Sequence, residues 1–217
     1  MEKEITLAIV GGTGSLGRGL TLRLAQPGIK VVVGSRDQGR AQHAADELNR
    51  TLGKDLIKGK LNSDAIREAE FIVIAVPYEG HEQMVREMGG GLENKIVIDA
   101  VVPLRKGRPF VPPAGSALQE AQSILGSAAP VVGAFHTISA VDLQDTRSSL
   151  GDVLVCGDSD AAKQRVMEIV RRLGARAFDA GLAANAYVVE GITGVLIHLN
   201  RKYKSKHASV KITGIGD

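Results

Sequence analysis

The chain has 217 residues, of which 44% are apolar and 24% are charged. This composition is typical of a compact folded protein and excludes a disordered one. A single cysteine excludes an internal disulfide and a zinc site built on several thiolates, so we expect a protein of the reducing cytoplasm. The longest apolar run, residues 71–77, is far shorter than the roughly 20 residues of a membrane helix, which argues against membrane insertion and secretion.

The formal net charge of +3 is concentrated at the C-terminal end. Residues 201–217 contain five Lys or Arg residues and one acid, Asp217. Aromatic residues make up 3% of the chain and Trp is absent, which argues against the base-stacking surfaces of nucleic-acid-binding proteins. We therefore expect no nucleic-acid partner. The basic end is either a solvated helix terminus or, together with Arg105, Lys106 and Arg108, a site that attracts an anionic substrate.

Apolar runs that alternate with helical patterns predict repeated strand and helix units. The predicted strands are residues 5–10, 30–33, 56–61, 71–76, 96–100 and 130–135. The predicted helices are residues 16–25, 37–52 and 116–125, with short polar helices after the third and fourth strands; the proline-rich residues 102–115 predict an extended loop. Strands as apolar as these must be covered on both faces, so the sequence predicts an α/β fold with a doubly wound parallel sheet.

The pattern changes after residue 137, and residues 142–149 are polar. Further elements are predicted at residues 153–156 (strand), 160–173 (helix), 175–178 (short strand) and 183–203 (long helix). We interpret the chain as a nucleotide-binding domain at residues 1–140 and a smaller, mainly helical C-terminal domain at residues 141–217.

A G-x-G-x-x-G motif, formed by Gly12, Gly14 and Gly17, lies between the first predicted strand and the first predicted helix. The first glycine permits a tight turn, the second leaves room for a pyrophosphate, and the third lets the helix and strand pack closely. The helix N-terminus attracts the phosphate charge. This placement predicts a Rossmann dinucleotide-binding site.

The end of the second strand indicates which dinucleotide binds. NAD-binding folds place Asp or Glu there to bind the ribose hydroxyls, but this chain has Ser35 and Arg36, with Arg40 one helical turn later. Asp37 is expected to cap the next helix instead. A hydroxyl and two guanidinium groups suit a 2′-phosphate, so the sequence predicts NADP(H) as the cofactor.

Reacting groups are expected at the carboxyl ends of the strands, where a doubly wound sheet binds its ligand. These ends carry few ionisable groups, and the sequence contains no Ser-His-Asp set, metal-ligand cluster or pair of carboxylates. We therefore expect no metal site and a hydride transfer whose chemistry comes from the cofactor. His136 follows the sixth strand and is the candidate catalytic residue; a structural role is the alternative. Cys156 lies in an apolar strand and is expected to be a core residue.

Five segments of the chain closely resemble the F420-dependent NADP oxidoreductase family, in the family's order. They are GGTGSLG at 11–17, VGSR at 33–36, VVGAFHTI at 131–138, VCGD at 155–158 and DAG at 179–181. The resemblance implies hydride transfer between NADPH and the deazaflavin coenzyme F420. It also implies a Rossmann domain followed by a small helical domain, and a homodimer.

By position, the resemblance implies further roles for individual residues. NADP would be held by Thr13, Gly14, Ser15, Leu16, Ser35, Arg36 and Arg40. The nicotinamide side would be lined by Val76, Pro77, Tyr78 and Ala140, and the deazaflavin would be faced by His136, Ile138 and Thr193.

Two features depart from the family pattern. Tyr187 and Gly191 stand where an Arg and a Ser are expected, and the C-terminal end is basic rather than apolar. Tyr187 either stacks on a bound ring or packs in the core. Besides the F420 interpretation, two alternatives stay open. One is an NADPH-dependent reductase of a flavin, ferric complex, imine or keto compound. The other is a non-catalytic NADP(H) sensor, in which side chains could fill the space of a second ring.

Overall fold

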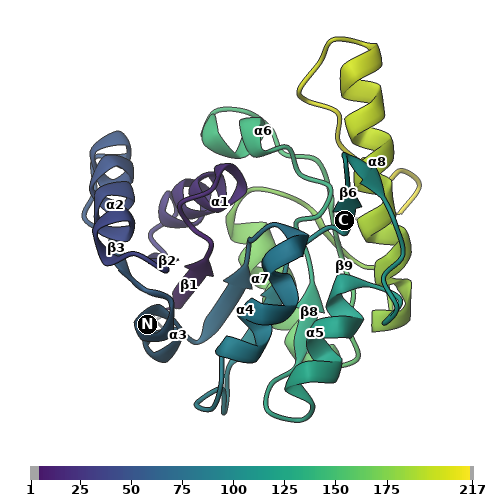
Figure 1. The fold of residues 1–217 in the computed structure, drawn as a ribbon. Coiled ribbons are helices and arrows are strands. Elements are labelled where there is room, and N and C mark those ends of the chain that lie inside the picture. The colour runs from purple at the N-terminus through teal and green to yellow at the C-terminus, as the bar shows by residue number, and fades with distance from the viewer. Residues whose placement is uncertain (1–4, 216–217) are drawn as a thin grey trace.

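The computed structural model describes residues 5–215; residues 1–4 and 216–217, including Asp217 of the basic end, lie outside the described residues. A six-stranded parallel sheet forms the centre of the molecule, in the order β3-β2-β1-β4-β5-β8 (Figure 1). Its strands are β1 (Thr6–Val10), β2 (Lys30–Ser35), β3 (Ile57–Leu61), β4 (Phe71–Ile74), β5 (Ile96–Asp99) and β8 (Val131–Gly133). Each predicted apolar run forms one of these strands, and the parallel, doubly wound fold is confirmed.

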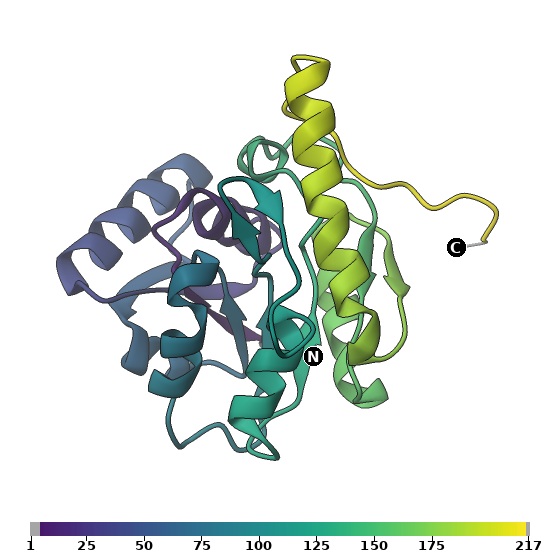
Figure 2. The same cartoon turned by 45° about the vertical axis from the view of Figure 1, so that its right-hand side comes forward.

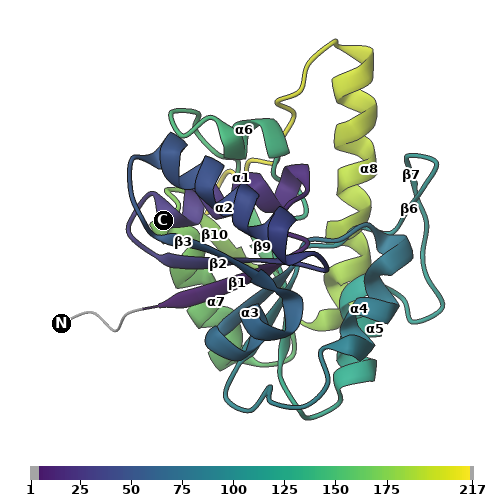
Figure 3. The same ribbon diagram turned by 60° about the vertical axis from the view of Figure 1, so that its left-hand side comes forward.

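Helices cover both faces of the sheet. One face packs against α1 (Ser15–Ala25), α2 (Gln38–Leu52) and α7 (Asp160–Arg172), and the other against α3 (Asn62–Glu68), α4 (His81–Glu87) and α5 (Ala117–Leu125). Figure 3 shows α2 and α3 on opposite sides of the strands β1 to β3. Both faces of the central strands are therefore buried, which explains why their sequences are apolar throughout.

The loop after β5 contains two short strands, although its four prolines predict an extended loop. Within residues 102–115, β6 (Leu104–Arg105) and β7 (Arg108–Pro109) pair as a short antiparallel hairpin. The prediction of an extended loop without strands was therefore wrong at these positions. The hairpin lies beside α8 (Ala186–Lys202), the long helix that also packs against α5 (Figure 2).

The C-terminal part continues the same core. β9 (Val153–Val155) and β10 (Ala177–Asp179) form a second parallel pair, and an antiparallel bridge joins Gly133 of β8 to Cys156. Val155, Val166 and Ile169 share one hydrophobic cluster with residues of β1 and β2. Packing therefore continues across the boundary predicted at residue 140. Cys156 is buried, as expected.

After α8 the chain turns back along the molecule as an extended tail. The Ser139 hydroxyl donates a hydrogen bond to the carbonyl of Lys206 (2.6 Å), and the Asp152 N–H donates to the carbonyl of Val210 (2.9 Å). The tail thus covers the start of α6 (Ala140–Gln144), a short helix within the polar stretch for which no element was predicted, and the edge of β9. Between residues 5 and 215, no helix is long and apolar enough to cross a bilayer.

Candidate active site

The turn between β1 and α1 brings backbone close to backbone. Gly11 has a φ of 81°, and a Cβ on it would lie 2.6 Å from the carbonyl oxygen of Ala75. A Cβ on Gly12 would lie 2.8 Å from the carbonyl oxygen of Ile9, and one on Gly17 would lie 2.6 Å from the Cα of Gly12. The first and third motif glycines are thus required for close packing. However, the left-handed residue of the tight turn is Gly11, not Gly12 as the motif predicts.

The N-terminus of α1 suits a bound anion. Gly14 is its N-cap, and a Cβ on this glycine would meet no atom nearer than the Gly11 oxygen, at 3.4 Å. Among the described residues, no side chain caps this helix, and its first turn holds no acid. The N–H groups of Ser15, Leu16 and Gly17 and the positive end of the helix dipole therefore fit a pyrophosphate.

The end of β2 presents a hydroxyl and two guanidinium groups. Ser35 is buried and its Oγ accepts a hydrogen bond from the N–H of Asp37 (3.2 Å). The Asp37 carboxylate accepts from the N–H of Arg40 (2.8 Å), so it caps α2 as predicted. Arg36 and Arg40 are exposed, and neither forms an ion pair with another described residue. This corner fits a phosphate better than two ribose hydroxyls, because its one nearby carboxylate is occupied by the helix cap.

A pocket of about 460 Å³ lies at the carboxyl ends of β4, β5 and β8. It brings together seven of the residues named from the sequence: Leu16, Val76, Pro77, Tyr78, His136, Ile138 and Thr193. The hairpin contributes Lys106 and Gly107 to the rim. The pocket therefore extends from the glycine loop to α8, as a site for two reactants requires.

His136 enters this pocket from a strained turn. The preceding Phe135 has a φ of 69°, which is rare for a bulky residue, and the Thr193 hydroxyl donates to the His136 carbonyl (2.8 Å). The His136 ring is buried, and neither of its nitrogens has a hydrogen-bond partner among the described residues. Burial lowers the pKa of His136 to about 4, and the charge of Asp99 opposes this only in part. The ring is therefore neutral at neutral pH.

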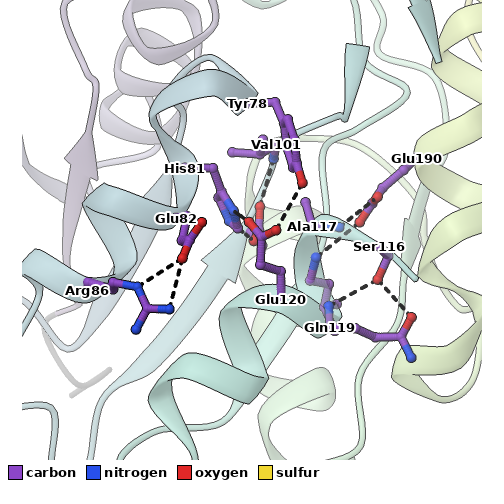
Figure 4. A network of polar contacts seen from close by, with 12 residues as sticks. Tyr78, His81, Glu82, Arg86, Val101, Ser116, Ala117, Gln119, Glu120 and Glu190 are labelled. Atoms are coloured by element: carbon purple, nitrogen blue, oxygen red, sulfur yellow. Dashed lines mark hydrogen bonds and ion pairs between the residues drawn. The ribbon is translucent and has the colours of Figure 1, made fainter. Parts of the chain in front are cut away.

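A second histidine lies near the pocket, joined to Tyr78, Asp99 and Glu120; we call these four residues the His81 network (Figure 4). His81 Nε2 lies 2.8 Å from Asp99 Oδ2, and its Nδ1 lies 2.7 Å from Glu120 Oε1. The Tyr78 hydroxyl donates to Glu120 Oε2 (2.9 Å). Asp99 is the last residue of β5 and is buried. Because the sequence predicts that this strand ends at residue 100, the carboxylate was not among the candidate residues, although its position at a strand end is a signal for it.

Ala140 and Tyr187, which were predicted near the reacting rings, do not line this pocket. Ala140 begins α6, and its carbonyl oxygen lies 3.3 Å from where a Cβ on Gly19 of α1 would be. Tyr187 lines a smaller neighbouring pocket with Phe110 and Gly191. Its side chain is 53% exposed, which excludes the interpretation that it packs in the core.

The comparisons with known proteins agree with this geometry. Residues 6–103 match the family model described as NADP oxidoreductase, coenzyme F420-dependent. The chain is 34% identical to the F420-dependent NADP reductase of Methanocaldococcus jannaschii over 96% of this chain and 98% of that protein. The chain belongs to this family. The resemblance predicted from the sequence is thereby confirmed.

Further similarities bear on the fold and on the acceptor. A crystal structure of a candidate F420-dependent NADP-reductase from Arthrobacter sp. FB24 covers 97% of this chain and 100% of its own, with a TM-score of 0.83 and 25% identity. The chain is also 33% identical to the rat metalloreductase STEAP3, over 88% of this chain but 37% of that protein. The family fold thus recurs as part of a longer reductase.

Proposed function

We propose that this protein transfers a hydride between NADP(H) and the deazaflavin coenzyme F420. The pocket carries the proposal, because it joins the glycine loop at Leu16 to His136, Ile138 and Thr193 in one space. NADPH, when bound, supplies the hydride. The protein's part is to bind both reactants, orient them and exclude water.

Each part of the cofactor has matching residues. The open N-terminus of α1 at Gly14 would hold the pyrophosphate, and Ser35, Arg36 and Arg40 would hold the 2′-phosphate. Val76, Pro77 and Tyr78 would line the nicotinamide side. Membership of the family supports NADP as the cofactor.

His136 is proposed to face the acceptor. Its ring nitrogens are buried without a partner, an arrangement that costs free energy unless a ligand completes it. A neutral imidazole donates one hydrogen bond and accepts another. A planar acceptor with polar groups at its edge would supply both partners.

Four basic side chains lie at or beside the pocket rim, against one acidic lining residue, Glu79, which supports an anionic acceptor. Lys106 lines the pocket, and Arg105 and Arg108 flank it on the hairpin. Arg201 Nη2 lies 3.0 Å from where a Cβ on Gly107 would be, so the end of α8 adds a further cation. None of these four side chains has an ion pair within the described part of the chain. This supports the interpretation of the basic residues as an anion-attracting site.

The similarity to STEAP3 favours a second candidate, an NADPH-dependent reductase of a flavin or ferric complex. The non-catalytic sensor is less well supported, because the space beside His136 is open rather than filled by side chains.

We also propose a homodimer. Helix α8 leaves Tyr187, Val188 and Val195 exposed, at 53%, 47% and 57%. An apolar stripe of this kind is typical of a surface that a second subunit covers.

The function is tested by mixing the protein with NADPH and oxidised F420 and following the loss of deazaflavin absorbance. We expect rapid bleaching with NADPH and much slower bleaching with NADH. Parallel reactions contain free flavin or a ferric chelate as the acceptor. If the protein reduces the flavin or the ferric chelate but does not reduce F420, the proposed acceptor is wrong.

A further inference from the structure

The His81 network connects the pocket wall to the core, and the proposed reaction gives no role to His81, Asp99 or Glu120. His81 begins α4, Asp99 ends β5 and Glu120 lies in the first turn of α5. His81 and Asp99 are completely buried. Asp99 Oδ1 also accepts from the N–H of Val101 (2.9 Å), a residue that lines the pocket. The network therefore ties two helices and a strand to one side of the pocket.

The geometry fixes the protonation state of His81. Each ring nitrogen faces a carboxylate oxygen, at 2.7 Å and 2.8 Å. An ionised carboxylate only accepts hydrogen bonds, and a neutral imidazole has one N–H to donate. When both carboxylates are ionised, both contacts are hydrogen bonds only if the ring is a doubly protonated imidazolium.

Glu120 links His81 to Tyr78, which is part of the pocket wall. One of its oxygens faces His81, and the other accepts the hydroxyl of Tyr78. The Tyr78 ring stacks beside His81 at 6.0 Å between centroids, and it forms a T-shaped contact with the Phe110 ring at 5.3 Å between centroids. The Tyr78 ring is thus held on its two sides and at its hydroxyl, and it lines the pocket.

We propose that His81, as an imidazolium, is a positioning residue that holds Glu120 and through it fixes the Tyr78 ring as a wall of the cofactor pocket. This rests on the proposed function in one respect, that the pocket binds the nicotinamide end of NADP(H). It does not depend on which acceptor is reduced.

The proposal has a definite pH dependence. Burial alone would lower the pKa of His81, but the hydrogen bonds and charges of Asp99 and Glu120 outweigh it and raise the pKa to about 9. Below that pH both carboxylates have a donor. Above that pH the His81 ring keeps one N–H, so one of the two carboxylates loses its hydrogen-bond donor. The Tyr78 ring is then held less firmly in the pocket wall.

Other ionisable groups lie near the His81 network, and their titration must be distinguished from that of His81. Glu190 of α8 accepts from the N–H groups of Ala117 and Leu118, and burial raises its pKa to about 8. Glu82 of α4 is an exposed carboxylate whose charge reaches Tyr78, and it pairs with Arg86 on the same helix. His136 is neutral over this pH range.

The test is a fluorescence titration of the full-length protein with NADPH from pH 7 to pH 10. We expect NADPH affinity to fall about threefold to tenfold as the pH passes about 9. This is the usual net effect of one hydrogen bond, because the bond that is lost supports the pocket wall and does not contact the cofactor. In Glu120→Gln the fall should move to lower pH, because His81 loses one of its two anionic partners. The matched control Glu82→Gln should keep the wild-type midpoint. Glu190→Gln removes the other group that titrates nearby, and the fall near pH 9 should persist.

Tyr78→Phe keeps the ring and removes its tie to Glu120. Its NADPH affinity at pH 7 should already equal that of the wild type at high pH, and it should not change further across pH 9. In turnover assays this variant should raise the KM for NADPH by a larger factor than it lowers kcat, because the hydroxyl that it removes contacts Glu120.

A wild-type NADPH affinity that is constant from pH 7 to pH 10 would overturn the proposal. So would identical pH profiles for Glu120→Gln and Glu82→Gln. A protein that binds NADPH with the expected pH profile but fails to reduce F420 contradicts the proposed acceptor and supports this inference, so the two failures are distinguishable.

Discussion

Two buried histidines at this pocket carry different charges at neutral pH. Among the described residues the His136 ring nitrogens have no hydrogen-bond partner, and burial lowers the pKa of His136 to about 4. The His81 ring has two carboxylate partners, and its pKa rises to about 9. The two shifts have opposite consequences for stability. The stability from His81 is present below its unfolded pKa of about 6.5 and is lost as the pH rises through 9. His136 destabilises the fold as the pH falls from about 6.5 towards 4, because protonation then favours the unfolded chain.

The sequence could locate His136 but not distinguish its chemistry from that of His81. His136 follows an apolar strand in a doubly wound sheet, so its place at the ligand edge follows from topology. The charge of each ring depends on which side chains reach it. Asp99 and Glu120 lie 18 and 39 positions from His81 in the sequence, and no periodicity links such distant residues.

Arg36 should determine the choice between NADPH and NADH. Arg36→Ala removes a charge-assisted contact to the 2′-phosphate, worth about 1.5 to 3 kcal/mol, so the Kd for NADPH should rise roughly tenfold to a hundredfold. The Kd for NADH, which lacks that phosphate, should change little. Arg50→Ala, near the far end of α2, is the control. Equal losses of NADPH and NADH binding would refute the NADP assignment.

At the level of elements, the packing of the hairpin on α8 shapes the pocket rim. A Cβ on Gly194 would lie 2.4 Å from the ring carbons Cγ and Cδ of Pro109 in β7. At Gly191, no described atom outside the neighbouring helix backbone lies within 4 Å of where a Cβ would be. The close approach of hairpin and helix therefore depends on one glycine of α8 and not on the other.

These two glycines give a matched pair of substitutions. Gly194→Ala should lower the free energy of unfolding by about 1 to 3 kcal/mol, because the rigid proline and the hairpin must move. Gly191→Ala should raise it by about 0.5 to 1 kcal/mol, since alanine is the better helix former. Urea unfolding measures both. A stabilised Gly194→Ala variant would show that the hairpin moves away without cost.

The long elements and several short strands were predictable, but the shortest elements in the irregular stretches were not. The strand at Ile96–Asp99 is apolar enough to identify from the sequence, and the helix over Gln38–Leu52 begins with its capping aspartate. The hairpin strands have two residues each, and α6 has five, within a stretch that is mostly polar. Elements this short contain too few residues for a hydrophobic period to be visible in the sequence. They depend on tertiary contacts, which the sequence does not show.

At the scale of the whole molecule, Arg23 joins the first helix to the segment after the sheet. This buried guanidinium donates to the carbonyls of Asp142 (3.0 Å), Asp145 (2.7 Å), Thr146 (3.2 Å) and Ser148. The contacts cross the boundary predicted at residue 140, and so does the hydrophobic core. Arg23 is a charged residue on the buried side of α1. Its position indicates a polar contact with another segment, which the prediction of two domains did not take into account.

Arg23→Met should therefore destabilise the whole fold. It preserves the length of the side chain but leaves several buried carbonyls without donors, so we expect a loss of about 3 kcal/mol in the free energy of unfolding. Arg18→Met is the control on the same helix: Arg18 pairs with Glu47 at the partly exposed surface, and its loss should cost less than about 1 kcal/mol. Thermal unfolding of both variants measures the difference. Similar losses would mean that the carbonyl contacts contribute little.

The returning tail has a consequence for biosynthesis. Ser139 directly follows Ile138 of the pocket, and Asp152 precedes β9, yet the carbonyls of Lys206 and Val210 that they bind are translated after all six strands of the sheet. The sheet can assemble as its strands are translated, N-terminal residues first. A nascent chain therefore gains these two contacts only after residue 210 has left the ribosome, and a premature stop codon just beyond α8 would yield a product without this support.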